Sequence, residues 1–279
     1  MLSGPWPAPA KLNLMLRVIG RRPDGYHELQ TVFQFLDRSD RLYFRVTDDD
    51  RVTRSGGLAD VPPEADLVVR AARLLRAETH CRRGVEIRLE KHLPAGGGLG
   101  GGSSDAATTL AVLNRLWQLD LPADRLAELG LRLGADVPVF LGGRAAWAEG
   151  VGERLEPVEL PEPWYLVIQP GCEVSTAAVF QHPELTRNSP RLTIRDFVAG
   201  QHGNDCLTVV AARYPEVRRA LDWLAEFGEA RLTGTGACVF AAFGTEQQAR
   251  DVLQGLPADM KGFVARGSNL SALRAALDD

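Results

Sequence analysis

The 279-residue chain lacks the features that mark secreted, membrane-spanning and nucleic-acid-binding proteins. Its four cysteines stand far apart, without the paired spacing of a zinc site or the density of a disulfide framework. No apolar run reaches membrane-spanning length, and no basic segment followed by an apolar one opens the chain. The formal net charge of −4 argues against general nucleic-acid binding. We therefore expect a cytoplasmic globular protein without membrane or nucleic-acid partners.

Lysine is scarce as well. Only three of the 32 basic residues are lysines, namely Lys11, Lys91 and Lys261, because the chain uses arginine for most of its positive charge. A lysine in an otherwise apolar segment is therefore a candidate for a specific role.

Glycine, in contrast, is concentrated in one place. Six of the eight residues 96–103 are glycines. Before them, residues 85–90 alternate between apolar and charged side chains, which predicts a half-buried strand. After them, residues 106–117 place apolar side chains at helical spacing, and Ser103, Ser104 or Asp105 is expected to cap that helix.

A strand, a glycine loop and a helix start together predict an anion-binding site. The first turn of a helix has unpaired N–H groups and a partial positive charge, and glycines let a phosphate approach closely. A flexible linker is the alternative, but it does not need a strand and a long helix at its ends. The loop is neither a Walker A loop, since no Lys precedes Ser103, nor a dinucleotide-binding fingerprint, since its glycine spacing differs.

Near the N-terminus, alternation predicts a strand up to Ile19. Ala10, Leu12, Leu14 and Leu16 share one face in this pattern. Lys11 and Asn13 share the opposite face with Met15 and Arg17, and lie about 7 Å apart along the strand. From this segment alone, a solvated strand face and a functional pair are both open.

Two further segments contain candidate functional side chains. Asp136 lies just before Val137 and Pro138 in apolar company, where the proline is expected to break the helix, so this carboxylate is either a cap or a working group. Tyr26 and His27 follow a Pro-Asp-Gly turn, and either form a ledge for a ring or cover the core.

The remaining pattern predicts an α+β protein of two lobes. Strands are expected over residues 31–36, 41–47, 145–149, 164–169, 239–243 and 262–265, and helices over residues 66–77, 122–133, 175–180, 205–213, 215–226 and 246–253. Residues 48–63 are expected to form a loop, and the Pro- and Glu-rich residues 157–163 are the best linker candidate. Residues 233–236 form a glycine turn that is either a plain turn or a second wall of the anion site.

Three motifs in this order resemble those of the GHMP kinases, a family of small-molecule kinases. They are Pro9-Ala-Lys-Leu-Asn13, Leu93-Pro-Ala-Gly-Gly-Gly-Leu-Gly-Gly-Gly-Ser-Ser104 and Leu232-Thr-Gly-Thr-Gly-Ala-Cys238. Four more segments extend the resemblance over nearly the whole chain: Pro23-Asp-Gly-Tyr-His27, Leu133-Gly-Ala-Asp-Val-Pro-Val-Phe140, Glu149-Gly-Val-Gly-Glu153 and Gly267-Ser-Asn-Leu-Ser271.

The resemblance implies a fold and a reaction. It implies a first lobe like domain 2 of ribosomal protein S5, over residues 1–158, that binds ATP, and a ferredoxin-like second lobe, over residues 159–279. It also implies transfer of the γ-phosphoryl group of ATP, accompanied by Mg²⁺, to a hydroxyl of a small cytidine-linked alcohol. A monomer or weak homodimer is expected, and no side chain is assigned as a metal ligand.

The resemblance also implies roles for individual residues. The catalytic positions match Lys11 and Asp136. The substrate-binding positions match Asn13, Tyr26, His27, Thr176 and Phe180, with the rings of Tyr26 and Phe180 on either side of the cytosine. The ATP-binding positions match Asp66, Pro94, Ala95, Gly96, Gly97, Gly98, Leu99, Gly100, Gly101, Gly102, Ser103 and Ser104.

Two acids depart from the pattern of the family member that the chain most resembles. Asp66 and Asp105 stand where asparagine is expected, the first near the adenine and the second near the triphosphate. An acid at position 105 favours the helix dipole but repels a triphosphate unless a cation lies between them. Two other readings stay open: a family member that acts on another small alcohol, and a nucleotide-binding regulator without activity.

Overall fold

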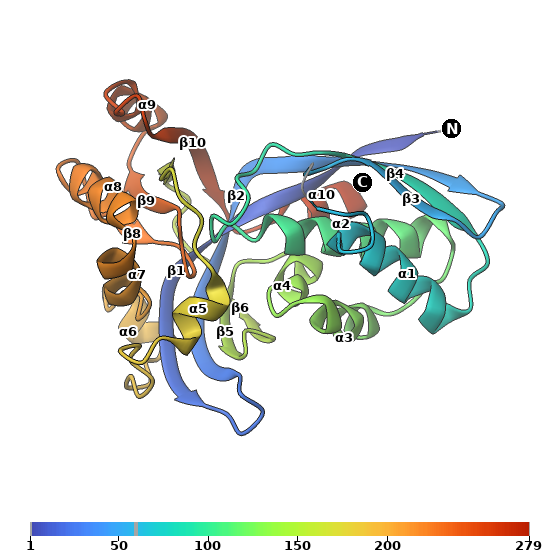
Figure 1. The fold of residues 1–279 in the computed structure, drawn as a ribbon, viewed down its shortest axis with the longest axis horizontal. Helices are drawn as coiled ribbons and strands as arrows, with labels where there is room; N and C mark the ends of the chain where they lie inside the picture. The colour runs from blue at the N-terminus through green and yellow to red at the C-terminus, as the bar shows by residue number, and fades with distance from the viewer. Residues whose placement is uncertain (1, 59–60, 279) are drawn as a thin grey trace.

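The computed structural model describes residues 2–58 and 61–278, which form two lobes joined by two long strands (Figure 1). The elements of the first lobe are β1 (Ser3–Arg21), β2 (His27–Thr47), β3 (Val52–Gly56), α1 (Leu67–Thr79), β4 (Gly84–Glu90), α2 (Gly101–Leu116), α3 (Ala123–Leu133), α4 (Val137–Gly142), β5 (Ala146–Gly150) and β6 (Arg154–Pro157). The later elements are β7 (Trp164–Gln169), α5 (Thr176–Gln181), α6 (Ile194–Val198), α7 (Leu207–Arg213), α8 (Pro215–Ala225), β8 (Arg231–Leu232), β9 (Val239–Phe243), α9 (Glu246–Gln254), β10 (Lys261–Ser268) and α10 (Ala272–Asp278).

Strand β2 connects the two lobes. It pairs antiparallel with β1 along nearly its whole length, with β4 toward its C-terminal end and with β5 toward its N-terminal end. At its middle, Phe35 and Leu36 pair with Ser268 and Gly267 of β10, which in turn pairs with β7. The sheet order is therefore β3-β4-β2-β10-β7-β9-β8, and only the β3–β4 pair on this path is parallel.

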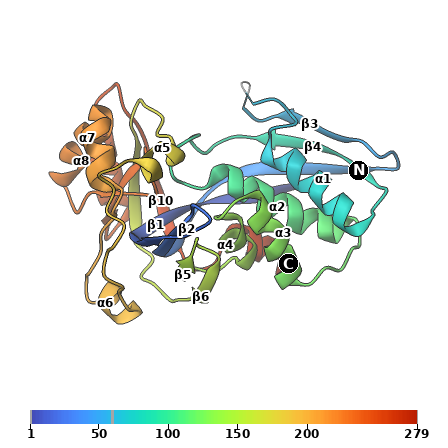
Figure 2. The ribbon, with the colours of Figure 1, turned by 60° about the horizontal axis from the view of Figure 1, so that its bottom comes forward.

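The helices of the first lobe cover one face of its sheet. Figures 1 and 2 both show α1 and α2 packed on the same side of β3 and β4. Val85, Ile87 and Leu89 of β4 are buried against these helices, as the alternation predicted. Within the described part of the chain, none of the helices is both long and apolar enough to cross a bilayer.

Strand β1 contributes to three hydrophobic clusters in succession. Ala8 packs in the first lobe, Leu12 and Leu14 at the junction, and Leu16 in the second lobe. The expectation that Leu16 shares a face with Leu14 is therefore wrong, because the two side chains pack in different hydrophobic clusters. The reason is an irregularity between Asn13 and Met15, where the pairing with β2 shifts. Such a shift changes which face the following side chains occupy.

Two strands differ from the sequence predictions. Residues 31–36 and 41–47 belong to one strand, because pairing with β1 keeps the polar residues between them extended. The predicted loop at residues 48–63 contains β3, which pairs with β4; Ala59 and Asp60 lie outside the described residues. Short polar strands of this kind depend on their partner rather than on their own pattern.

Two helix starts also differ. Helix α2 begins at Gly101, after the left-handed Gly100, and no side chain caps it, so the expected cap at residues 103–105 is wrong. The helix is interrupted before Pro138, since α3 ends at Leu133. Pro138 itself lies in the first turn of α4, where a proline is tolerated because its missing N–H would be unpaired anyway. Helix α1 is capped by Asp66, whose carboxylate accepts from the N–H of Val68 at 2.8 Å.

The last helix, α10, packs with the first lobe although it lies at the end of the chain. Leu273 is 1% exposed and belongs to the cluster formed by α1–α4 and their sheet. The N–H of Ser271 donates to the carbonyl of Gly143 at 3.0 Å, which fixes the helix start beside α4. The division of the chain at residue 158 stays a prediction, and residues 271–278 contribute to the core of the first lobe.

We expect Leu273→Ala to lower the free energy of unfolding by about 2–5 kcal/mol, because it leaves a cavity in that core. Leu270→Ala is the matched control; its side chain is 40% exposed, so a change within about 0.5 kcal/mol is expected. Urea unfolding followed by circular dichroism measures both. Equal losses for the two variants would contradict this account of α10.

Candidate active site

The glycine loop between β4 and α2 is held by its carbonyl groups. It lies between β1 and residues 233–238 of the second lobe. Three backbone hydrogen bonds fix it: Lys11 to Leu99 (3.0 Å), Ala237 to Gly96 (3.2 Å) and Cys238 to Gly97 (3.2 Å). No acceptor in the described chain takes a hydrogen bond from the N–H groups of residues 96–103. Free N–H groups at the start of a long helix form a site for an anion.

Close contacts explain why glycines are needed in this loop. Gly98 and Gly100 both have a φ of +72°, a left-handed conformation that side chains disfavour. A Cβ at Gly98 would lie 2.3 Å from the carbonyl oxygen of Thr233, and a Cβ at Gly100 would lie 2.7 Å from the ring of Phe140. Any other residue would push the loop away from its neighbours.

The Lys11 ammonium lies beside this loop and is buried, at 2% exposure for the residue. Its Nζ contacts three oxygens: Oδ1 of Asn13 at 2.5 Å, the carbonyl of Gly98 at 3.1 Å and Oδ2 of Asp136 at 3.2 Å. Lys11 and Asn13 therefore point the same way, as the alternation predicted, but toward the interior rather than into solvent. A buried charge of this kind is stable only when such partners surround it.

Asp136 reaches this lysine from the start of α4. The carboxylate makes no capping hydrogen bond, so of the two roles left open by the sequence, the cap is excluded. Its side chain is 34% exposed, whereas that of Lys11 is 3% exposed. One side of the ion pair therefore faces an open space, and the other side is buried.

Thr233 completes the support of the site and was not among the predicted residues. Its buried hydroxyl accepts from the N–H of Asn13 at 3.0 Å and donates to the carbonyl of Gly98 at 3.2 Å. The turn at residues 233–236 is thus a wall beside the first glycine loop, which was one of its two open interpretations. Asn13 is also fixed through its amide, which donates to Thr31 Oγ1 at 2.8 Å.

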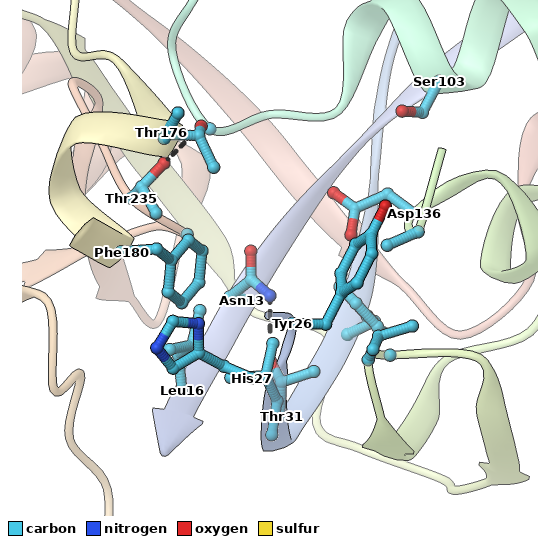
Figure 3. Close-up of a pocket in the computed structure, with 18 of the residues that line it drawn as sticks. Asn13, Leu16, Tyr26, His27, Thr31, Ser103, Asp136, Thr176, Phe180 and Thr235 are labelled. Carbon is cyan, nitrogen blue, oxygen red and sulfur yellow. Dashed lines mark hydrogen bonds between the residues drawn. The ribbon is translucent and has the colours of Figure 1, made fainter. Parts of the chain in front are cut away.

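Two adjoining cavities meet at the Lys11–Asp136 pair. One, of about 810 Å³, contains Asn13, Tyr26, His27 and Phe180 in its lining (Figure 3). The other, of about 400 Å³, is lined by Asp66 and by the whole loop of residues 94–103. Four residues line both cavities: Gly98, Ser103, Asp136 and Thr176. Ligands in the two cavities would therefore approach each other at Asp136.

The aromatic residues of the larger cavity lie on its two sides. Figure 3 shows Tyr26 on the same side as Asp136, and Phe180 on the opposite side. The Tyr26 residue is 63% exposed, whereas the His27 ring stacks on that of Phe180 with centroids 5.0 Å apart and planes 25° apart. Thr176 lies nearby and shares a hydrogen bond with Thr235, with their hydroxyl oxygens 2.8 Å apart.

Arg187 is a second residue that sequence reasoning missed. Its Nε donates to Nε2 of His27 at 3.1 Å, and its Nη2 donates to the carbonyl of Phe180 at 2.8 Å. Burial, followed by the charges of Arg187 and Arg21, lowers the pKa of His27. Arg187 lies in an irregular polar segment, and no periodicity links it to the ring that it contacts.

Ser104 and Asp66, predicted to contact the nucleotide, have different settings. Ser104 is fully buried and lines neither cavity, and its hydroxyl has no partner in the described chain. Asp66 lines the smaller cavity, but its Oδ2 is engaged by Nη1 of Arg54 at 2.7 Å. The carboxylate at position 66 therefore has its own arginine counter-ion.

Asp105 lies beneath the glycine loop, and a lysine compensates the negative charge of its carboxylate. Its Oδ2 lies 2.7 Å from Nζ of Lys91, which also binds Asp40. Burial raises the pKa of Asp105 to about 7, against the pull of Lys91 and with the added effect of Asp40. Two carboxylates share one ammonium group here, and Oδ1 of Asp105 has no partner in the described residues.

Comparison with known proteins defines the class. The family models described as GHMP kinases N terminal domain and GHMP kinases C terminal match residues 66–144 and 190–262. The chain belongs to the GHMP kinase family, and the two-lobed α+β fold predicted from the sequence is confirmed.

Its relatives narrow the class further. The chain is 60% identical to the 4-diphosphocytidyl-2-C-methyl-D-erythritol kinase of Thiobacillus denitrificans, over 95% of this chain and 96% of the relative. It is also 60% identical to the enzyme of that name from Alkalilimnicola ehrlichii, over 98% of this chain and 94% of the relative.

Solved structures of similar fold lead to the same family. A crystal structure of 4-(cytidine 5'-diphospho)-2C-methyl-D-erythritol kinase superposes with a TM-score of 0.82 at 34% identity, covering 96% of this chain and 99% of the other. A mevalonate kinase superposes with a TM-score of 0.71 at 17% identity, covering 96% of this chain and 100% of the other, and shares the fold alone.

We expect Gly98→Ala to weaken ATP binding by at least about tenfold, since left-handed backbone strain costs about 1–3 kcal/mol and the Cβ also meets Thr233. Gly171→Ala is the control, because nothing lies within 4 Å of a Cβ at that position. Isothermal titration calorimetry with a non-hydrolysable ATP analogue measures both. Parental affinity in Gly98→Ala would show that the loop does not need this conformation.

Asp105 predicts a pH dependence of stability. Since its pKa in the folded protein is about 7, the folded state holds a proton that the unfolded state releases above about pH 4. The free energy of unfolding therefore falls as the pH rises from about 4 to about 7. Asp105→Asn should flatten this fall, whereas Asp222→Asn, at an exposed position, should not. Urea unfolding at several pH values decides, and identical profiles for Asp105→Asn and the parent would contradict the assignment.

Proposed function

We propose that this protein phosphorylates the 2-hydroxyl of 4-diphosphocytidyl-2-C-methyl-D-erythritol with ATP, a step in the non-mevalonate route to isoprenoid precursors. One observation carries the proposal: a cavity lined by a glycine loop and a cavity lined by aromatic rings meet at one acid–lysine pair. The identity of 60% to kinases of that name supports the choice of substrate.

The smaller cavity takes ATP in this proposal. The free N–H groups of residues 96–103 bind the phosphates, and the start of α2 adds its partial positive charge. Asp66, paired with Arg54, lies where the adenine is expected. The charge of Asp105 is offset by Lys91, which reduces its repulsion of the triphosphate.

Mg²⁺ accompanies the nucleotide. Oxygen atoms are the ligands that Mg²⁺ prefers, and it is usually bound by one or two carboxylates together with substrate phosphates. The hydroxyl oxygen of Ser103 fits as one such donor, because Ser103 lines the two cavities where they meet. When bound, the ion neutralises charge on the β- and γ-phosphates.

The larger cavity takes the cytidine-linked alcohol. Tyr26 and Phe180 come from opposite sides of the cavity and supply two rings for the cytosine, and the ring of His27 stacks on that of Phe180. Asn13 and Thr176 also line this cavity and supply polar contacts. A cytoplasmic location and a monomer or weak homodimer as the active form belong to the same proposal.

The chemistry follows from the acid–lysine pair. The substrate hydroxyl oxygen attacks the γ-phosphorus in line, the bond from that phosphorus to the β–γ bridging oxygen breaks, and ADP leaves. Asp136 accepts the hydroxyl proton, and Lys11 offsets negative charge on Asp136 and on the transferred group. Phosphoryl transfer asks a protein mainly for positioning and electrostatic stabilisation, which this pair and the loop supply.

A substrate panel tests the function. Purified protein is incubated with ATP, Mg²⁺ and, in turn, the cytidine-linked alcohol, mevalonate and homoserine, and ADP release is measured. Turnover of the cytidine-linked alcohol alone is expected, because aromatic rings suit a base and not an aliphatic chain. Turnover of another alcohol would move the protein to a different member of the family, and none at all would favour a regulator.

We expect Asp136→Asn to lower kcat by about 10²–10⁴-fold, since the amide cannot accept the proton, while ATP still binds. Asp124→Asn is the control, because that acid lies in the first turn of α3, outside both cavities. Initial rates and ATP binding are measured side by side. Turnover of Asp136→Asn at the parental rate would remove the general-base role.

A further inference from the structure

Arg187 joins the two segments that form one aromatic wall of the larger cavity. Besides His27 and Phe180, its guanidinium donates to the carbonyls of Leu185 and His182, at 3.0 and 2.8 Å. Four hydrogen bonds therefore tie the start of β2 to the end of α5 and the loop that follows it. A planar guanidinium can satisfy such divergent acceptors at once, whereas an ammonium group cannot do so in the same geometry.

The hydrogen bond to His27 determines where the proton of that ring lies. A guanidinium only donates, so Nε2 of His27 must act as the acceptor. A neutral imidazole with an accepting Nε2 has its hydrogen on Nδ1. Among the described residues, Nδ1 meets no partner and is not among the fully enclosed polar atoms. The ring itself lines the cavity, so its Nδ1–H is available to a ligand.

The charges around His27 also favour the neutral form of its ring. Arg187 and Arg21 both lie near the ring, and together with burial they lower its pKa, so that the ring stays uncharged at neutral pH. No carboxylate opposes them as a cause of this shift. The neighbouring Glu28 is engaged by Arg154 at 2.6 Å, and by Arg191 at 3.4 Å.

We propose that Arg187 is a positioning residue for the base of the substrate: it locks His27 and Phe180 into one stacked wall and holds His27 as the Nδ1–H tautomer. The wall then offers the base a flat surface and a hydrogen-bond donor without a positive charge. A donor suits N3 and O2 of cytosine, which both accept, whereas N3 of uracil has a hydrogen of its own. This inference rests on the proposed function, because it assumes that a cytidine-linked substrate occupies the larger cavity.

The first test uses the parental protein and needs no variant. Nitrogen-15 spectra of the histidine rings, assigned by comparison with His27→Gln, report which ring nitrogen has the hydrogen. We expect His27 in the neutral Nδ1–H form at neutral pH. Finding the hydrogen on Nε2 would overturn the proposal whatever the enzyme's activity.

The second test separates positioning from a general structural effect. Arg187→Ala should raise KM for the cytidine-linked alcohol by about tenfold, the loss expected for one well-placed contact and a loosened wall, with kcat and KM for ATP within about threefold. The ratio of the affinity for CDP to the affinity for UDP should fall in Arg187→Ala. The His27 ring of this variant should titrate at a higher pH than in the parent. Arg187→Lys should resemble Arg187→Ala, because one ammonium cannot replace four hydrogen bonds.

Arg191→Ala is the matched control. Arg191 lies in the same segment, and the polar partners of its guanidinium among the described residues are two acids, Glu28 and Glu149. KM, kcat, the CDP over UDP ratio and the titration of His27 should therefore stay parental. Arg187 has no positioning role if Arg187→Ala keeps the parental KM for the cytidine-linked alcohol and the parental CDP over UDP affinity ratio. The same conclusion follows if the variant raises KM for the alcohol and KM for ATP equally. If the parental protein does not phosphorylate the cytidine-linked alcohol at all, the proposed function fails, and the ring spectra and the CDP over UDP ratio still decide the role of Arg187.

Discussion

The site depends on one buried ammonium group. Nζ of Lys11 lies among oxygens from three parts of the chain, namely Asn13 on the same strand, the Gly98 carbonyl in the glycine loop and Asp136 at the start of α4. Placing a charge in the interior is costly unless its partners are fixed in advance. The rest of the fold provides that fixation: β2 positions Lys11 and Asn13, Thr233 braces the loop, and the first turn of α4 positions Asp136.

A second lysine balances charge on the other side of the same loop. Lys91 lies between Asp40 and Asp105, and Asp40 also accepts from the N–H of Leu93 at 2.8 Å, just before the loop begins. Each of these two lysines therefore anchors one flank of the anion site to acids: Lys11 to the partly exposed Asp136, and Lys91 to the buried Asp40 and Asp105. In a chain that uses arginine nearly everywhere else, both cations that flank this loop are lysines. A compact ammonium with three donors suits an enclosed cluster of oxygens better than a wide guanidinium does.

Local sequence patterns predicted the separate elements of this site, but not which of their residues come together in the fold. The strand, the glycine loop and the helix were readable from periodicity, and so was the shared face of Lys11 and Asn13. Nothing in the sequence around Asp136 indicates that it faces Lys11; that pairing was expected only from the family resemblance. Arg187 was missed, and Thr233 was expected only as part of a turn with two open interpretations, because the importance of both residues lies in contacts made across the fold. The start of α2 was misjudged because a capping rule was applied to a helix whose first N–H groups remain free.

The position of α10 has a consequence for biosynthesis. The sheet and helices of the first lobe leave the ribosome early, whereas β10 and α10, which complete that lobe, are translated only after β7 to α9 of the second lobe. Domains often fold as they emerge, but this lobe must wait with an uncovered apolar surface until Leu273 has been added. The nascent chain therefore passes through a long interval in which a chaperone has a surface to bind.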